Sequence, residues 1–177
     1  MKIYAASLTD YAAGILHGCW IDLEESTDME DIRTQLDAML KVSPTAQREG
    51  RPAEEIAIHD TKDAPTGLGE ISLDKAIEVQ DCLDALARHW FDDPLDILEA
   101  WIDCHGPWNP LEASEIIDNY KGQYDDEEAL AYEYAEDSGL FEGVADTLRL
   151  YFDFKAYGRD LCINHFIMAQ NGHTFYR

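Results

Sequence analysis

The sequence predicts an α+β fold, built as an elongated chain of three small domains. Runs that alternate apolar and polar residues, typical of strands, occur near both ends of the chain, whereas helical periodicity dominates its middle. Hydrophobic residues make up 46% of the 177-residue chain, which is enough apolar material for packed cores. We therefore expect an α+β domain over residues 1–61, a helical domain over 62–108 and a second α+β domain over 109–177.

Short strands are the main feature expected of the first domain. Residues 2–8 form one candidate and residues 18–23 a second, with apolar and polar side chains in alternation. A third strand is predicted around Ile56 and Ile58, which alternate with Ala57 and His59. The segment 43–53 contains two prolines and a glycine and is predicted to be a polar loop.

One amphipathic helix is expected between these strands. Thr27 followed by Glu30 matches a capping box, in which each residue satisfies a free backbone amide of the first turn. The apolar residues behind it recur at steps of three and four. They are Met29, Ile32, Leu36, Met39 and Leu40. This spacing places them on one face of a helix, which we expect to cover the strands.

Helices are expected to make up the second domain. Ser72 can cap a helix that runs to about His89, and Asp93-Pro94 starts another with proline at its favoured first position. A third helix is predicted near residues 112–119, after a break rich in glycine and proline.

The last domain is predicted to mix helices with a closing hairpin. Asp125 or Asp126 can cap a helix through about Asp137, and Ser138-Gly139 ends it. Further helical stretches are predicted over 144–150 and 154–162. Asn171-Gly172 is a strong hairpin signal and joins a strand over 166–169 to one over 173–176.

Charge is the unusual property of this sequence. It has 37 acidic against 13 basic residues, for a formal net charge of −24. The excess is spread evenly, with 12 acidic against 5 basic residues in 1–61, 11 against 3 in 62–108 and 14 against 5 in 109–177. Such a chain is not expected to bind nucleic acid or an anionic membrane surface, because both need basic partners. A folded body that is negative throughout favours basic protein partners instead.

The cysteines and the N-terminus point to the cytoplasm. Cys19, Cys82, Cys104 and Cys162 are widely scattered, and we expect them to be reduced, buried thiols. Lys2 and the short apolar run after it do not make a signal peptide, and no apolar run approaches the length of a membrane span.

Rows of carboxylates on the expected helices are the candidate functional site. Asp92, Asp93, Asp96, Glu99 and Asp103 recur at steps near three and four, and a second dense cluster begins at residue 125. Four helical residues rise about 6 Å, whereas phosphates recur about every 3.4 Å along a DNA strand, so a row has DNA-like but sparser charge. The full candidate set is Asp92, Asp93, Asp96, Glu99, Asp103, Glu112, Glu115, Asp118, Asp125, Asp126, Glu127, Glu128, Glu133, Glu136 and Asp137.

Other interpretations of these rows remain open. Any single row is also what a solvated helix face looks like, and adaptation to high salt gives acidic proteins of unrelated function. An acidic adaptor or chaperone for another basic protein is the main alternative function. The interpretation as a DNA-like surface is favoured because the rows recur in every third of the chain and lysine rarely offsets them.

Catalytic, cofactor and metal sites have little support in the sequence, and we expect a non-enzymatic protein without them. Cys162 and His165 have a C-x2-H spacing, but no second half of a zinc site follows. His59-Asp60 is better explained as a strand end than as a catalytic pair. An acidic hydrolase would need two carboxylates in one deep pocket with separated pKa values, which abundant carboxylates do not by themselves indicate.

Motifs along the chain resemble those of the ArdA family of antirestriction proteins. They occur in the family's order over nearly the whole length, and their succession is more specific than any one of them. They are Tyr11-x2-Gly14-x-Leu16-x-Gly18-x-Trp20, Glu55-Ile56-Ala57-Ile58-His59-Asp60, Gly69-Glu70-x-Ser72-Leu73, Tyr132-x4-Asp137-x-Gly139 and Tyr151-Phe152-Asp153-Phe154-x-Ala156-Tyr157-Gly158-Arg159-Asp160-Leu161.

The resemblance implies an inhibitor encoded on a mobile element. Its target would be a type I restriction–modification enzyme, whose DNA-binding and methyltransferase core it occupies, blocking cleavage and often methylation. The resemblance also implies an elongated homodimer of three-domain protomers. The family's antirestriction motif falls around residues 125–139 here, where it would serve dimerisation as much as target contact.

Overall fold

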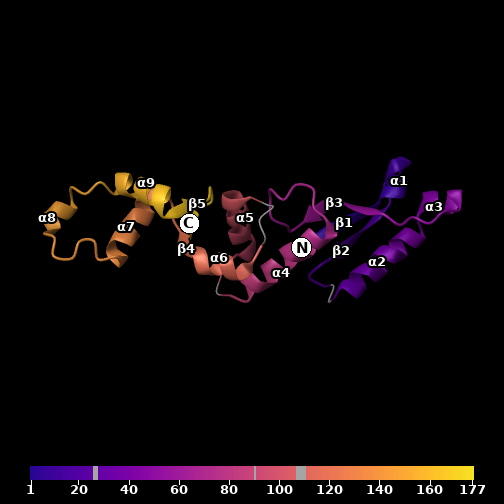
Figure 1. Ribbon diagram of the computed structural model, residues 1–177, viewed down its shortest axis with the longest axis horizontal. Helices are drawn as coiled ribbons and strands as arrows, with labels where there is room; N and C mark the ends of the chain where they lie inside the picture. The colour runs from indigo at the N-terminus through magenta and orange to yellow at the C-terminus, as the bar shows by residue number, and fades with distance from the viewer. Residues whose placement is uncertain (26–27, 90, 107–110) are drawn as a thin grey trace. The chain divides into compact units, whose positions relative to one another are not determined.

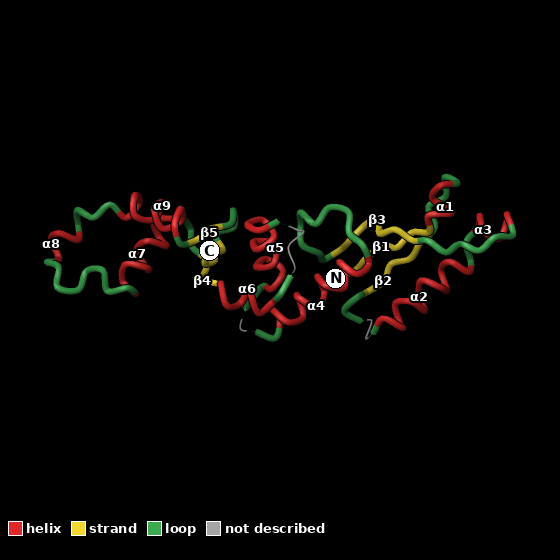
Figure 2. The backbone as a smooth tube through the Cα atoms, viewed as in Figure 1, coloured by secondary structure: helices red, strands yellow, loops and turns green. Residues whose placement is uncertain are grey.

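The computed structural model describes residues 1–25, 28–89, 91–106 and 111–177, and its contacts group into two compact units. The first unit is Met1–Leu95 and the second is Asp96–Arg177. Each unit holds one small antiparallel sheet with helices around it (Figure 2), which confirms the α+β class. The division into three domains stays a prediction.

The sheet of the first unit has the strand order β2–β1–β3 (Figure 1). Its strands are β1 (Lys2–Ser7), β2 (Gly18–Asp22) and β3 (Ile56–Lys62). Both neighbours are antiparallel to β1, with Ile3 opposite Ile21 in β2 and opposite Thr61 in β3. Ile3 and Ile21 are fully buried, so the period-two pattern that predicted these strands also selects the side chains of the core.

Helix α2 (Met29–Lys41) contacts β1 and β2 through the predicted apolar face, of which Ile32, Leu36 and Met39 are buried. Its cap is Asp28, whose carboxylate accepts hydrogen bonds from the amides of Glu30 and Asp31 at 2.8 and 2.9 Å. Thr27, the predicted cap, lies outside the described residues.

The prediction of a loop over 43–53 was wrong, because α3 (Pro44–Glu49) lies within it. The Ser43 hydroxyl accepts from the Ala46 amide, Pro44 occupies the first helical position, and Gly50 ends the helix with a φ of 68°. These are ordinary start and stop signals. Another short helix, α1 (Leu8–Ala12), was also not predicted.

The predicted helices of the middle of the chain are confirmed. They are α4 (Leu73–Ala87), α5 (Pro94–His105) and α6 (Ala113–Asn119). Ser72 caps α4 as expected, with its hydroxyl 3.2 Å from the Lys75 amide. No helix among the described residues is long and apolar enough to cross a membrane.

The second unit adds a sheet with the order β4–β6–β5, whose strands β5 and β6 contact helices α9 and α6. The predicted hairpin is confirmed as β5 (Phe166–Met168) and β6 (His173–Tyr176), but β4 (Tyr120–Gln123) was not predicted. The remaining helices, all predicted, are α7 (Glu127–Asp137), α8 (Asp146–Arg149) and α9 (Phe154–Asn164).

The core of this unit forms where α7 and α9 meet the sheet. Leu130 of α7, Leu161 of α9 and Phe166 of β5 are buried together. The two helices approach so closely that a Cβ atom added at Gly158 would lie 2.0 Å from the carbonyl oxygen of Glu127. Glycine at this position is therefore a packing requirement.

Candidate functional site

Most of the predicted carboxylates face solvent. Twelve of the fifteen candidate residues are exposed, whereas Asp96, Glu99 and Glu127 are half-buried. All but Asp92 and Asp93 belong to the second unit. They lie on or beside three helices, α5, α6 and α7.

The row on α5 has the predicted geometry. Asp96, Glu99 and Asp103 are spaced by three and four residues in a continuous helix and therefore share one side. Asp92 and Asp93 precede this helix, and the Asp93 carboxylate caps it by accepting from the Leu95 amide at 3.1 Å. A capping carboxylate also interacts favourably with the positive end of the helix dipole.

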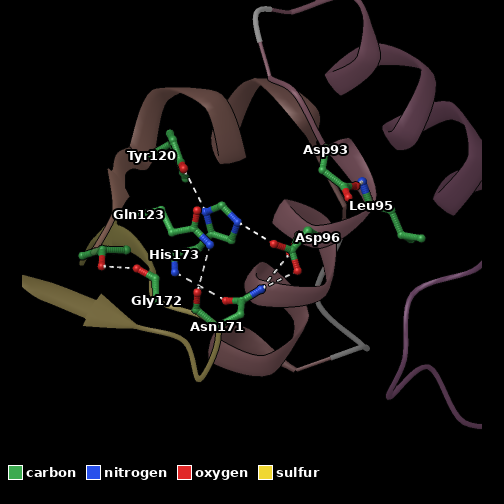
Figure 3. A network of polar contacts seen from close by, with 9 residues as sticks. Asp93, Leu95, Asp96, Tyr120, Gln123, Asn171, Gly172 and His173 are labelled. Atoms are coloured by element: carbon green, nitrogen blue, oxygen red, sulfur yellow. Dashed lines mark hydrogen bonds and ion pairs between the residues drawn. The ribbon is translucent and has the colours of Figure 1, made fainter. Parts of the chain in front are cut away.

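Both ends of the α5 row contact the turn between β5 and β6. Asp103 accepts a long hydrogen bond, 3.4 Å, from the Gln170 amide. Asp96 accepts at 2.8 Å from the side-chain amide of Asn171 and lies 3.0 Å from Nε2 of His173 (Figure 3). These two carboxylates thus hold α5 against the hairpin as well as contributing charge.

A second acidic group surrounds α6. Glu112, Glu115 and Asp118 are all exposed and follow each other at steps of three, which keeps them close on the helix surface. Glu112 occupies the N-cap position without a side-chain capping bond. The three carboxylates are therefore placed by the backbone of a single turn-and-helix segment.

The third group begins α7. Asp125, Asp126 and Glu128 are exposed, and the Asp126 carboxylate caps the helix by accepting from the Ala129 amide at 2.8 Å. This confirms the predicted capping in this segment. Four consecutive acidic residues at a helix N-terminus are tolerated because the free amides there partly offset their repulsion.

Further along α7, the half-buried Lys121 of β4 offsets two of the carboxylates. Nζ of Lys121 lies 3.2 Å from carboxylate oxygens of both Glu133 and Asp137. Burial lowers the pKa of this lysine, but the two hydrogen bonds outweigh burial and raise the pKa well above its usual value. The hydroxyl of Tyr124 also donates to Glu133, at 2.6 Å. Lysine was expected to offset the acidic rows only rarely, and this end of α7 is one place where it does so.

Arg149 offsets a third carboxylate of α7. It donates hydrogen bonds to Glu136 and, at 3.0 Å, to the hydroxyl of Tyr132. Its guanidinium also lies 5.2 Å from the ring centres of Tyr132 and Phe141, within reach of a cation–π attraction. Arg149 belongs to α8, so these contacts attach α8 to α7.

Large apolar side chains are exposed beside Arg149. Leu150 is 84% exposed and Tyr151 is 87% exposed, with Leu148 and Val144 also in solvent. Scattered exposed leucines are common on proteins, but several within one short segment indicate a contact surface.

Sequence reasoning missed Lys121, Arg149 and His173 as partners of the acidic residues. The contacts of Lys121 and Arg149 span 12 to 17 residues, and those of His173 with Asp96 span 77. No local pattern reports such pairings. The one available signal was the scarcity of basic residues, since a single basic residue in an acidic segment is expected to pair with a nearby carboxylate.

No three His, Cys, Asp or Glu side chains are arranged to hold a metal ion in the part of the chain that the structure describes. The chain matches the model of a protein family described as antirestriction protein (ArdA) over residues 3–175. No match was found among curated proteins.

Proposed function

The chain belongs to the ArdA family of antirestriction proteins, and from this premise we propose that it inhibits a type I restriction–modification enzyme by presenting a DNA-like acidic surface to the groove in which that enzyme binds DNA. The family match over residues 3–175 is the observation that carries the antirestriction function. The mechanism is our inference from charge and exposure.

Competitive exclusion is the proposed mechanism. A DNA-binding groove is lined by Lys and Arg side chains that neutralise phosphates. Exposed carboxylates such as Glu115, Asp118 and Glu128 would engage the same side chains. The negative field of a protein with a net charge of −24 speeds its encounter with a basic groove, and salt weakens that attraction. Because DNA and inhibitor need the same Lys and Arg side chains, we expect bound inhibitor to block cleavage and often methylation.

The contacts described above divide the candidate carboxylates by their expected contribution. Those with an internal cation, namely Glu133, Glu136 and Asp137, present less net charge to a partner. The exposed residues at the start of α7 and around α6 carry their charge outward. We propose that these two groups, with Asp92 and Asp93, supply most of the contact with the enzyme.

A homodimer is part of the proposal. Two acidic protomers repel each other, so their association needs apolar surface. The exposed segment that contains Leu148, Leu150 and Tyr151 provides such surface, and the contacts of Arg149 fix it to α7. Sedimentation equilibrium of the wild type and of Leu150→Ser/Tyr151→Ser would test this: the proposal requires a dimer that the double variant weakens.

DNA cleavage by purified type I enzymes tests the proposed function. The protein is titrated at fixed DNA and at two salt concentrations, and methylation is followed in parallel. Competition at the groove requires inhibition that excess DNA relieves and that higher salt weakens. A folded dimer that inhibits none of several type I enzymes would favour the acidic adaptor instead, and pull-down with basic DNA-binding proteins would then be the next test.

A simple control distinguishes the proposed inhibitor from a protein whose acidity is an adaptation to high salt. An acidic protein adapted to salt needs it to fold, because its surface charges repel without it. The proposed inhibitor has to work at low salt, where steering is strongest. Circular dichroism at low and high salt distinguishes the two: unfolding at low salt would contradict the proposal.

A further inference from the structure

A chain of side-chain hydrogen bonds crosses the second unit from β4 to α5. The ring of His173 lies between Tyr120 and Asp96 (Figure 3), with Nδ1 2.8 Å from the tyrosine oxygen and Nε2 3.0 Å from a carboxylate oxygen. His173 is buried, with only 7% of its side chain exposed. Such a buried polar chain is costly unless every group in it is paired.

The chemistry of the three groups fixes the direction of the bonds. An ionised carboxylate can only accept, so Nε2 of His173 donates its proton to Asp96. In a neutral ring Nδ1 is then the acceptor, and the hydroxyl of Tyr120 donates to it. The neutral histidine is therefore held in one tautomer and one orientation, since the reverse tautomer would leave Asp96 without this donor.

The turn next to His173 adds a second connection between the same elements. Asn171 donates to the Asp96 carboxylate at 2.8 Å, and the side-chain amide of Gln123, in β4, donates to the carbonyl of Asn171 at 3.0 Å. Helix α5 is thus bonded through the hairpin to β4 at two points. Residue 123 ends β4, and the acidic start of α7 follows two residues later.

We propose that His173 is a positioning residue for the acidic surface. It holds the carboxylates of α5 and those that follow β4 at a fixed mutual distance, as a rigid mimic of regularly spaced phosphates requires. The inference rests on the proposed function and adds to it. Charges that are already in place when the partner arrives cost no ordering on binding. Without the bond from His173 to Asp96, α5 would keep its charge, but only the contacts of Asn171 and Gln170 would bond its carboxylates to the hairpin.

Two substitutions at His173 distinguish the contribution of its bond to Asp96 from that of its bond to Tyr120. In His173→Gln the side-chain amide reaches the Nε2 position and can still donate to Asp96. In His173→Asn the shorter side chain keeps a polar group near Nδ1 for Tyr120 but does not reach Asp96. His165→Asn is the matched control, because His165 is an exposed histidine of the same unit.

Inhibition of cleavage is measured for these variants at a temperature at which circular dichroism shows each fully folded. We expect His173→Asn to weaken inhibition about tenfold, the usual size of a lost hydrogen bond to a charged group. His173→Gln should stay within about threefold of the wild type and His165→Asn should be unchanged. A merely structural role would lower the melting temperature of His173→Asn and leave the inhibition by its folded form intact, which would overturn the inference.

Nitrogen NMR of the wild-type ring gives a readout that needs no target enzyme. We expect a proton on Nε2 and none on Nδ1 of the neutral ring, and the opposite tautomer would overturn the inference. Should His173→Asn fail to fold, Tyr120→Phe carries the inhibition test, because it deletes the hydroxyl that holds the His173 ring toward Asp96 and keeps the ring of residue 120 against Phe175. We expect weaker inhibition from this variant, and inhibition equal to that of the wild type would overturn the inference. A wild type that inhibits no enzyme overturns the proposed function, whereas an inhibiting wild type matched by folded His173→Asn overturns this inference alone.

Discussion

The backbone amide of Thr45 donates a 2.8 Å hydrogen bond to the carboxylate of Asp10, a side chain with no exposed surface. Burial alone would raise the pKa of Asp10, but the nearby hydroxyls of Ser43 and Ser7 and the hydrogen bond from the Thr45 amide outweigh burial and hold the pKa well below its usual range. One buried negative charge thus joins α1 to the start of α3 in the first unit.

Asp10→Asn is expected to destabilise the first unit by about 2 kcal/mol, because it removes the charge that these groups stabilise and places an NH2 group where a carboxylate oxygen lies beside the hydroxyls. The pKa of Asp10 is lower in the folded than in the unfolded chain, so its contribution is complete above pH of about 4 and is lost as the pH falls below that value. Urea unfolding of both proteins at pH 7 and pH 3 measures this. If the two proteins differed in unfolding free energy by the same amount at both pH values, the charge of Asp10 would not be the cause.

Gly158→Ala is expected to cost about 3 kcal/mol or more, since its Cβ would meet the Glu127 carbonyl and force α7 and α9 apart. Gly143→Asn is the matched control. Gly143 has a φ of 77° with open space around it, and asparagine tolerates that conformation. Thermal melts of the two variants should differ by many degrees, and similar melting temperatures would show that the two helices can separate freely.

Removing carboxylates is expected to act cumulatively on inhibition. A single Glu115→Gln change should weaken it less than about threefold, as for most exposed charges. The triple variant Glu112→Gln/Glu115→Gln/Asp118→Asn should weaken it about tenfold and make it less sensitive to salt. Titration of cleavage at two salt concentrations measures both. One exposed Asp→Asn change that abolished inhibition with the fold intact would exclude a distributed acidic surface.

Lys121→Met should have opposite effects on stability and charge. It leaves Glu133 and Asp137 without their shared cation, so we expect the second unit to lose about 1 kcal/mol of stability. It also makes the surface more negative, so inhibition by the folded protein should be at least as strong as that of the wild type. Weaker inhibition would mean that the geometry of α7, rather than its charge, limits binding.

The cysteines are expected to react slowly. All four are free, but only Cys82 is buried and the others are half-buried, so the expectation of buried thiols holds in part. Burial raises the pKa of Cys82 and of Cys104 to about 11, which leaves little thiolate at neutral pH. Iodoacetamide should modify these two about a hundredfold more slowly in the native protein than in urea. Mass spectrometry of the labelled chain tests this, and equal rates would show that neither thiol is protected.

Elements with strong local signals were predictable from the sequence. The strands β1, β2 and β3, the amphipathic face of α2, the caps of α4 and α7 and the final hairpin all follow from periodicity, capping residues and a turn dipeptide. Helix α3 was predictable in principle, since Ser43-Pro44 and Gly50 mark its ends, but its six residues are too short to show an apolar period.

Features that depend on contacts between residues far apart in the sequence were not predictable. Strand β4 has no alternation of its own, and it exists because it pairs with β6, with Tyr120 opposite Phe175. The candidate carboxylates were readily identified by type and spacing. Their separation into exposed charges and charges offset by Lys121 or Arg149 depends on tertiary contacts, which a single sequence does not report.

The strand order of the second sheet has a consequence for synthesis of the chain. The central strand, β6, is the last of the three to leave the ribosome, and neither β4 nor β5 has another strand to pair with until it does. Each paired residue of β4 therefore precedes its partner in β6 by 50 to 55 positions. Nascent chains stalled before residue 173 should lack the sheet of the second unit and be cleaved there by proteases. The first unit differs, because its central strand, β1, is synthesised first.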